Sequence, residues 1–296
     1  MLLLCLIWSL QQIALKAVAH LMAPMLQIAL RSGVALALVA CLMAWRGERF
    51  DWKGWRPGLA VGALFALEYL FVAEALRQTS AGHTVVFLYT SPVFAAIGLH
   101  LKLPSERLSR TQWAGIALAF GGVAYSFLGG RAAGGAAVSL WGDTLALLGG
   151  AAWGATTVTL RSTSLSTTAP NQAILYQLGG AFFLLAPAAV LAGQTHFDPT
   201  PLLWASLAYQ TFIMSFASLL VWFWLLRHYV AATLGVFTFL TPVLGVVLGA
   251  LLLGEPIEPR FVVGSLGVLA GLATVSLHRP LSARARQLLA YCTSAA

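Results

Sequence analysis

One acidic residue, Glu68, lies deep inside a long apolar run of the chain. It stands about 11 residues into that run, or roughly 16 Å at the 1.5 Å rise per residue of an α-helix. An ionisable group this deep in hydrocarbon is costly and is therefore a candidate functional group. Glu68 could bind a substrate ammonium, carry a coupling proton, or be neutralised by an ion pair. We predict that it belongs to a substrate site.

Two tryptophans, each with a polar residue one helical turn later, are further candidates. Trp8 and Gln12 are four residues apart, as are Trp153 and Thr157, so each pair shares one helix face. Such a face offers an indole for stacking and hydrogen bonds to an amine or a carboxylate. The same residues could instead anchor a helix at the membrane interface or join neighbouring helices. We include all four in the predicted site.

Two prolines interrupt apolar runs near their middle. Pro92 and Pro242 lack the N–H group that would bond to the carbonyls of Leu88 and Thr238. In lipid, a freed carbonyl is tolerated where it faces a cavity or a polar neighbour. We therefore predict hinge-like kinks beside a cavity, although static packing kinks would give the same pattern.

Aromatic side chains and one histidine precede these prolines. Tyr89 lies beside Pro92, and His83 begins the same run. Phe87 and Phe237 hold equivalent places before the two prolines. A histidine can titrate near neutral pH, but one at the end of a span is more often simply solvated, and the two phenylalanines could equally pack in the core. We predict that these four residues contact the substrate.

The composition shows which solvent surrounds these residues. Of the 296 residues, 59% are hydrophobic and 9% charged, against about 25% charged residues in soluble domains. The solvent is therefore expected to be a lipid bilayer. The net charge of +8 comes from basic residues in short loops, so no nucleic-acid partner is expected. The three cysteines are widely spaced, which predicts neither a disulfide framework nor a metal site.

Motifs for energy-driven or enzymatic chemistry are missing from the sequence. It contains no G-x4-G-K-[ST] phosphate-binding loop and no H-E-x-x-H metal motif. Only Glu68 and Glu74 are acids well inside apolar runs, fewer than a lipid-modifying enzyme would need. We therefore expect neither an enzyme nor a cofactor. A receptor or a non-transporting membrane scaffold remains an alternative to a transporter.

The elements that position these residues are ten apolar runs, each long enough to cross a bilayer as a helix. Met1 leads directly into the first run with no basic segment and no cleavage site, so we expect a retained span rather than a signal peptide. The predicted spans are 2–20, 25–45, 57–76, 82–101, 111–128, 140–160, 171–192, 202–226, 231–253 and 260–278.

The basic residues of the loops predict the orientation. If both termini are cytoplasmic, the opposite side holds only Arg77, Arg131 and Arg260. Lys16 and Arg31 lie within spans, toward the external side together with Glu74, and these three could neutralise one another. The excess of cytoplasmic bases indicates cytoplasmic termini. The cytoplasmic segments then hold Arg46, Arg49, Lys53, Arg56, Lys102, Arg107, Arg110, Arg161, Arg227, Arg279, Arg284 and Arg286.

An internal repeat divides the chain in two. Arg77-x3-Ala81-x4-Val86-Phe87-x4-Pro92-Val93 recurs with identical spacing from Arg227 to Val243. Glu106-x8-Gly115-x6-Gly122 recurs as Glu255-x8-Gly264-x6-Gly271. More weakly, the segment from Trp8 to Lys16 aligns with that from Trp153 to Arg161. Both glutamates are expected to cap turns or to pair with Arg110 and Arg260.

Five spans separate each element from its copy, and an odd number inverts the second copy relative to the first. This is the architecture of many secondary transporters, whose substrate site lies near the midplane. The predicted fold is an all-α integral membrane protein with ten transmembrane helices, arranged as two inverted five-helix repeats around a central cavity. We place the repeats at 1–138 and 139–280, followed by a basic cytoplasmic tail, 281–296.

Several short motifs carry a family resemblance over residues 1–278. Trp8-Ser9 and Trp153-Gly154 open the halves, Ser91-Pro92 and Thr241-Pro242 fall in mid-span, and Gly254-Glu255-Pro256 closes the ninth span. In this order they resemble the EamA family of the drug/metabolite transporter superfamily. The first half departs from the pattern, with Leu103-Pro104-Ser105-Glu106 in place of Gly-Glu-Pro.

The resemblance implies ten helices, cytoplasmic termini, and export of small metabolites across the inner membrane. The substrates would often be amino acids, as in the YddG-type exporters of aromatic amino acids. A sugar-phosphate or nucleotide-sugar exchanger of the same superfamily is the alternative, but it must compensate a phosphate with interior cations. Lys16 and Arg31 are the only ones expected, so a neutral or zwitterionic substrate fits better. A monomer and a homodimer both remain open.

Overall fold

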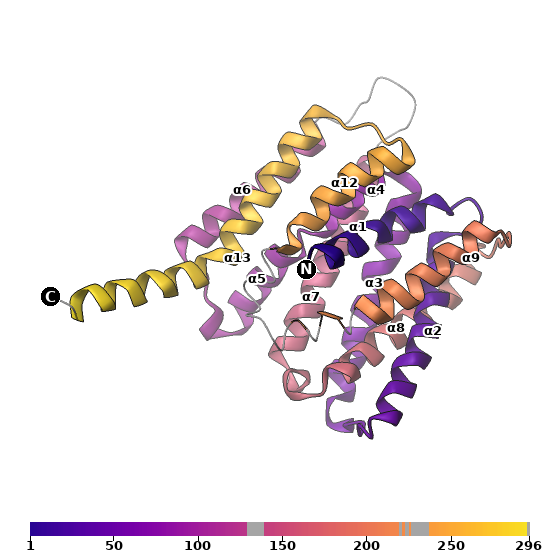
Figure 1. Cartoon of the computed structure of the whole chain (residues 1–296), viewed down its shortest axis with the longest axis horizontal. Coiled ribbons are helices and arrows are strands. Elements are labelled where there is room, and N and C mark those ends of the chain that lie inside the picture. Colours follow the sequence, from indigo (N-terminus) through magenta and orange to yellow (C-terminus); the bar gives the residue numbers. More distant parts are fainter. Residues whose placement is uncertain (129–138, 219–220, 223–224, 226–236, 295–296) are drawn as a thin grey trace.

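The computed structural model describes residues 1–128, 139–218, 221–222, 225 and 237–294. Helices dominate this part of the chain, which contains one isolated β-bridge, Met22–Phe197, and no strand. In order, the helices are α1 (Leu2–Ala17), α2 (Pro24–Trp45), η1 (Trp52–Gly54), α3 (Trp55–Gln78), α4 (Ala81–Leu88), α5 (Ser91–Lys102), η2 (Pro104–Glu106), α6 (Arg110–Leu128), α7 (Leu140–Ser162), η3 (Ser164–Thr167), α8 (Pro170–Leu191), α9 (Pro201–Ala208), the π-helix η4 (Tyr209–Ala217), α12 (Leu240–Leu253) and α13 (Pro259–Ser294) (Figure 1).

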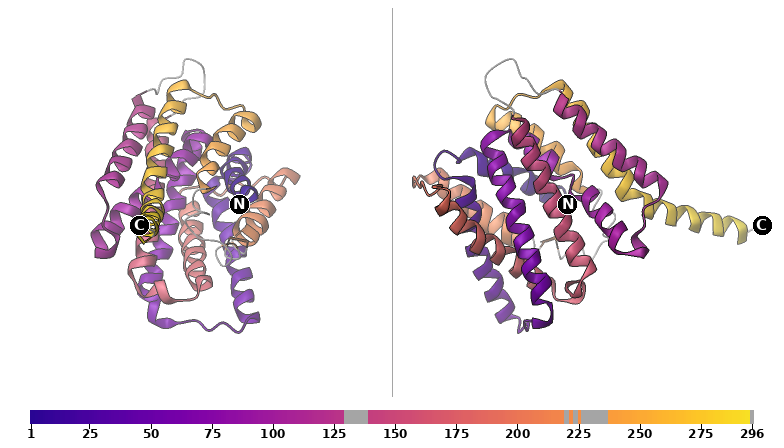
Figure 2. Two further views of the ribbon diagram at one scale, coloured as in Figure 1. Left: turned by 60° about the vertical axis from the view of Figure 1, so that its left-hand side comes forward. Right: turned by 180° about the vertical axis from the view of Figure 1, so that it is seen from behind.

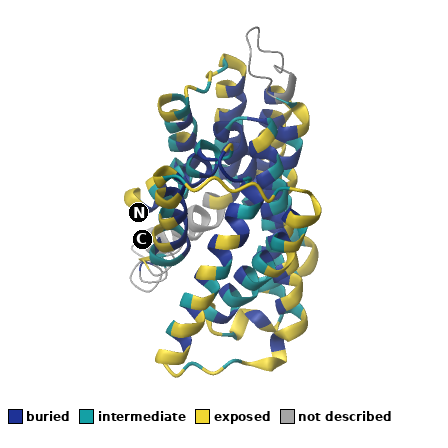
Figure 3. Ribbon diagram, turned by 90° about the vertical axis from the view of Figure 1, so that its right-hand side faces the viewer, coloured by how far each residue is buried: buried dark blue, intermediate teal, exposed yellow. Residues whose placement is uncertain are grey.

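These helices confirm the predicted all-α membrane fold. Within the described residues, five helical segments are long and apolar enough to cross a bilayer, and α1 and α12 are apolar but shorter. Parts of the predicted spans 202–226 and 231–253 lie outside the described residues. Buried residues face the interior, and exposed ones lie on the outer faces and loops (Figure 3). Large apolar side chains are exposed along the outer helix faces, as lipid contact requires: Val34, Leu118, Phe183, Phe212, Val247 and Leu266.

The helices begin and end where the sequence supplies suitable residues. Pro24, Pro170, Pro201 and Pro259 each stand at the first position of a helix, where no N–H is needed. Gly254 ends α12 with a φ of +65°, a conformation that favours glycine. The turns between spans are therefore encoded locally.

The loops gather alternately at two ends of the molecule. At the end that we call the basic end, Asp51 bonds to Gln172, Glu48 to Asn171, and Arg161 to Glu106. At the other, the distal end, the loop after α1 bonds to the loop after α8, because Asp198 N–H donates to the Leu21 carbonyl. Successive spans thus run in opposite directions, as in a multi-pass membrane protein.

Close glycine contacts between α6 and α13 show the inverted repeat directly. A Cβ on Gly122 would lie 2.5 Å from the carbonyl oxygen of Gly264, and one on Gly115 would lie 3.0 Å from that of Gly271. The helices are therefore antiparallel. Gly264 and Gly271 are the repeat mates of Gly115 and Gly122, so exchanging the halves turns one contact into the other. Both helices form one flank, from which the C-terminal part of α13, including the predicted tail, projects (Figure 2).

The remaining contacts follow the same symmetry. α5 packs on α7, just as its repeat mate α12 packs on α1, and α4 packs on both α7 and α12. α3 packs on α7 and α4, and η4 packs on α1 and α2. We call α3, α4, α5 and α7 the first bundle, and α1, η4 and α12 the second bundle. Helices α2 and α8 pack on each other and flank both.

Replacing Gly122 with alanine tests the tight α6–α13 contact. The new methyl group would clash with backbone atoms, and overpacking of this kind costs about 1–3 kcal/mol. Gly121→Ala is the matched control, because nothing lies within 4 Å of its Cβ position. We expect Gly122→Ala to lower the unfolding temperature in detergent and Gly121→Ala to leave it equal or slightly higher. Equal unfolding temperatures for the two variants would contradict the packing.

Candidate substrate site

A cavity of about 400 Å³ lies between the two bundles and the flanking helices. Helices α1, α2, α3, α7, α8 and η4 contribute to its walls, as do the residues around the break between α4 and α5. Its lining is mixed, with aromatic, amide, hydroxyl and charged side chains: Trp8, Gln11, Gln12, Arg31, Ser32, Phe65, Glu68, Tyr69, Leu88, Tyr89, Pro92, Trp153, Ile174, Gln177, Leu178, Met214, Ser215, Ser218, Trp222, Thr238 and Phe239.

Both predicted proline kinks coincide with breaks in the helices. In the first half, Tyr89 and Thr90 separate α4 from α5, and Pro92 is the second residue of α5. In the second half, Phe239 precedes α12, and Pro242 is its third residue. Tyr89 and Phe239 are repeat mates, and both line the cavity. Broken backbone at membrane depth is tolerated where it lines a cavity.

Aromatic rings form the apolar walls. Tyr89 meets Trp153 edge-on with 5.4 Å between ring centroids, and Trp8 meets Trp222 at the same separation. The Trp8 indole N–H donates to Ser218 Oγ at 3.2 Å, which fixes its ring. The cavity therefore offers pre-positioned aromatic surfaces on opposite bundles.

Arg31 supplies a buried positive charge. It lies on α2, about 10 Å along the helix from Pro24, and only 3% of its surface is exposed. The guanidinium carbon is 4.7 Å from the centroid of the Tyr69 ring. With its amide oxygen turned toward Arg31, Gln11 accepts from both terminal guanidinium nitrogens at 3.2 Å. Arg31 Nε has no hydrogen-bond partner among the described atoms.

This position corrects the predicted cluster of Arg31, Lys16 and Glu74. Lys16 Nζ instead lies 3.1 Å from Glu255, and Arg77 pairs with Glu74 on the same helix at 2.9 Å. Arg31 points into the cavity because its face of α2 turns toward the protein interior. The position of a residue along the chain gives its depth in the membrane but not the direction of its side chain. Arg31 therefore belongs to the cavity rather than to an ion-pair network at the membrane surface.

Glu68 supplies a buried carboxyl group to the same cavity. It is 4% exposed, and its Oε2 has no hydrogen-bond partner among the described atoms. Arg31 acts on it electrostatically, but no ion pair within 4.0 Å involves Glu68 in the described residues. The amide oxygen of Gln12 is likewise without a partner there. Buried polar atoms without hydrogen-bond partners are costly, so this arrangement is suited to a ligand that completes it.

Six of the residues predicted for the site or its hinges line this cavity: Trp8, Gln12, Glu68, Tyr89, Pro92 and Trp153. Further lining residues were not predicted for the site, among them Arg31, Tyr69, Phe65, Trp222 and Phe239. Phe239 could have been found as the repeat mate of Tyr89, and Gln11 as a neighbour of Gln12. The lining residues of α2, α8 and η4 have no motif that marks them.

Four predicted contacts and one predicted hinge do not line the cavity. Phe87 is fully buried in a hydrophobic cluster between helices, whereas Phe237 is 43% exposed. Thr157 donates its hydroxyl to the Trp153 carbonyl one turn earlier and faces a different cavity. Pro242 is buried beneath the break that it follows. The equivalent sequence positions of Phe87 and Phe237 thus have unequal surroundings.

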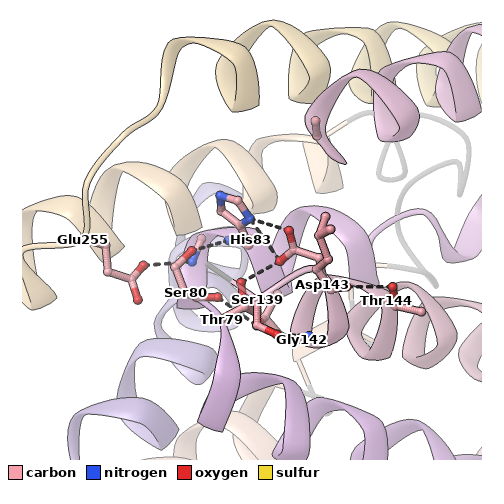
Figure 4. A network of polar contacts seen from close by, with 12 residues as sticks. Thr79, Ser80, His83, Ser139, Gly142, Asp143, Thr144 and Glu255 are labelled. Atoms are coloured by element: carbon pink, nitrogen blue, oxygen red, sulfur yellow. Dashed lines mark hydrogen bonds and ion pairs between the residues drawn. The ribbon is translucent and has the colours of Figure 1, made fainter. Parts of the chain in front are cut away.

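His83 is neither in the cavity nor solvated. Its Nδ1 lies 3.0 and 3.1 Å from the two carboxylate oxygens of Asp143, and Thr79 Oγ1 donates to the same carboxylate at 2.6 Å (Figure 4). Its ring stacks on Phe261 with centroids 3.7 Å apart. The histidine therefore joins α4 to α7 inside the first bundle, and Asp143 is the acceptor at the centre of that network.

A second cavity of about 370 Å³ extends toward the basic end. Pro92 and Trp153 line both cavities, so the Trp153 ring stands between them. At its far side Glu106 forms an ion pair with Arg161 at 2.8 Å. The partner suggested by the sequence was Arg110. No group of three or more metal-ligating side chains occurs within the described residues.

Comparison with known proteins agrees with this architecture. One solved structure, described only as "Crystal structure of protein", covers 94% of this chain and 96% of its own, with a TM-score of 0.61 and 21% sequence identity. At that identity the likeness shows the fold alone. A search of curated proteins gives no match. The model of the EamA-like transporter family matches residues 1–128 and 140–277. Both halves are matched, so the chain belongs to the EamA-like transporter family, within the drug/metabolite transporter superfamily of multi-pass membrane proteins.

Proposed function

We propose that this protein is a secondary transporter that exports a zwitterionic metabolite, an amino acid with an aromatic or other apolar side chain, by alternating access. One observation carries the proposal. Arg31 and Glu68, of opposite charge, face the same aromatic-lined cavity, and both retain polar atoms without partners among the described residues. Transport proceeds without chemical conversion of the substrate, so the protein is not an enzyme and needs no cofactor.

The chemistry of the lining matches the parts of an amino acid. A guanidinium binds a carboxylate through paired hydrogen bonds, and a carboxylate such as Glu68 binds an ammonium. An apolar side chain would then rest against Trp153 and Tyr89. A sugar phosphate fits less well, because Arg31 would face a dianion while Glu68 adds a further negative charge. Among the described lining residues, no second cation offsets that charge.

The membrane context completes the proposal. The protein resides in the inner membrane with both termini in the cytoplasm, so the basic end faces the cytoplasm. One chain builds the whole cavity, and a monomer therefore suffices for transport, whether or not two copies associate as a homodimer. The rocking of one bundle against the other, with bending at the breaks before Pro92 and Pro242, would expose the cavity alternately to each side.

Transport into liposomes tests the assignment of the site. Purified protein is reconstituted, and uptake of a panel of radiolabelled amino acids is measured with and without a pH gradient. We expect Arg31→Gln, Glu68→Gln and Trp153→Ala each to lower the rate about tenfold or more, because a hydrogen bond to a charged group contributes about 1.5–3 kcal/mol. Glu48→Gln is the control, since Glu48 bonds Asn171 at the basic end. Unchanged transport in all three variants would refute the site.

Substrate analogues distinguish the two charges. An amino acid without its ammonium group should compete about tenfold or more less well than the complete amino acid in the wild type. In Glu68→Gln this difference should shrink, because the partner of the ammonium is gone. A decarboxylated amine should show the same behaviour with Arg31→Gln. If each variant loses selectivity for the other group instead, the orientation of the substrate is reversed.

Cysteine labelling tests the orientation in the membrane. Lys53→Cys marks the basic end and Thr195→Cys the distal end, in a protein whose native cysteines are replaced by serine. Thr195 is chosen because nearby Gly193 has a φ of +66° and would be strained by a side chain. An impermeant maleimide added to intact cells should label Thr195→Cys and should reach Lys53→Cys only after permeabilisation. Labelling of both from one side would contradict the model.

A further inference from the structure

At the distal end, the side chain of Glu255 connects the two bundles. Its Oε1 accepts from the N–H of Ala81 at 2.7 Å, and its Oε2 accepts from the N–H of Gly82 at 3.1 Å (Figure 4). Lys16 Nζ lies 3.1 Å from Oε1. We propose that this carboxylate is a latch that holds the distal end closed over the substrate cavity. The inference rests on the proposed alternating access and names the contact that must open for release.

The partners of Glu255 come from both bundles. Lys16 is in the last turn of α1, and Glu255 follows α12, so both belong to the second bundle. Ala81 and Gly82 form the first turn of α4, in the first bundle. His83, in the same turn, bonds to Asp143 of α7, which ties α4 to its own bundle. Separation of the bundles would therefore break the contacts of Glu255 with Ala81 and Gly82 and leave the Lys16 and His83 contacts intact.

The chemistry suits a contact that opens and closes. A carboxylate at a helix N-terminus accepts from N–H groups that have no partner within the helix, and it complements the helix dipole. Glycines make room for it, since a Cβ on Gly249 would lie 2.6 Å from Glu255 Oε2. The polar groups involved can be hydrated when the end opens to water, but the packing of α4 on α12 must also be broken. Broken packing between α6 and α13 would have no such compensation.

The latch is linked to the cavity through one rigid element. Helix α4 has eight residues and is about 12 Å long. Its first turn binds Glu255, and the break that follows its last residue, Leu88, places Tyr89 against Trp153 in the cavity. A displacement of α4 at the latch therefore moves the cavity wall.

The repeat supplies an independent argument. The sequence aligns Glu106 with Glu255 and Arg161 with Lys16. In the structure each acid pairs with its corresponding base, at 2.8 Å at the basic end and 3.1 Å at the distal end. The ion pair is thus a feature of the repeated unit, and inversion puts one copy at each end. Glu106→Ala is therefore a matched control for Glu255→Ala.

The latch is tested by the accessibility of the cavity, which does not require transport. Ser32, a buried lining residue, is replaced by cysteine in a protein with no other cysteine. An impermeant thiol reagent is applied to right-side-out and inside-out membrane vesicles. From the distal side, identified by Thr195→Cys, we expect Glu255→Ala to raise the labelling rate about tenfold. Lys16→Glu, which places a like charge beside Glu255, should raise it as well.

The controls separate a latch from general loosening. Glu106→Ala should leave labelling from the distal side equal or slower, and each variant must keep the elution profile and unfolding temperature of a folded protein. The latch is refuted if Glu255→Ala and Lys16→Glu label at the parental rate, or if Glu106→Ala accelerates labelling equally. If labelling behaves as expected while Arg31→Gln and Glu68→Gln transport normally, the latch stands and the proposed substrate site fails.

Discussion

The absence of water in the hydrocarbon core is the constraint on which this structure depends. Backbone groups must be satisfied within helices, so an interruption is tolerated only beside a cavity. The described residues include two such interruptions, before Pro92 and before Pro242, and residues of both line one cavity. The buried charges Arg31 and Glu68 face the same space. Broken backbone and ionisable groups thus share one site, where a polar ligand can satisfy both.

The sequence predicted the fold because its signals are properties of whole segments. Apolar length gives the spans, and the spacing shared by Arg77–Val93 and Arg227–Val243 gives the repeat. An odd number of spans then gives the inversion, which the paired glycines of α6 and α13 display. The site was harder to predict, since a helix has no mark for the face turned inward. Trp153 and Glu68 were found as unusual residues, whereas Trp222 and Tyr69 resemble any other aromatic residue of a span.

The polar contacts between elements that are distant along the chain could not be predicted from the sequence. His83 and Asp143 are separated by 60 positions, and their contact depends on how α4 packs on α7. Lys16 and Glu255 come from opposite ends of the chain, so local reasoning assigned each a nearer partner. The pattern of spans gives the sign of the charge on each ionisable residue and its approximate depth in the membrane. Partner choice depends on angles between helices, which result from the packing of many small residues, such as Gly122 against Gly264.

Inverted duplication has a consequence for how such a protein can move. A polar pair encoded once in the repeated unit must occur at both ends of the molecule, in opposite bundles. If such a pair holds one end closed, its copy is placed to serve the other end, and alternation between two states requires no additional element. The two copies need not be equal: Lys16 has become Arg161 across the repeat, and 56% of the Arg161 side chain is exposed against 28% for Lys16. Glu255 contacts the opposite bundle while it is paired with Lys16, so unequal pairing of the two glutamates would bias the resting equilibrium toward closure of one end.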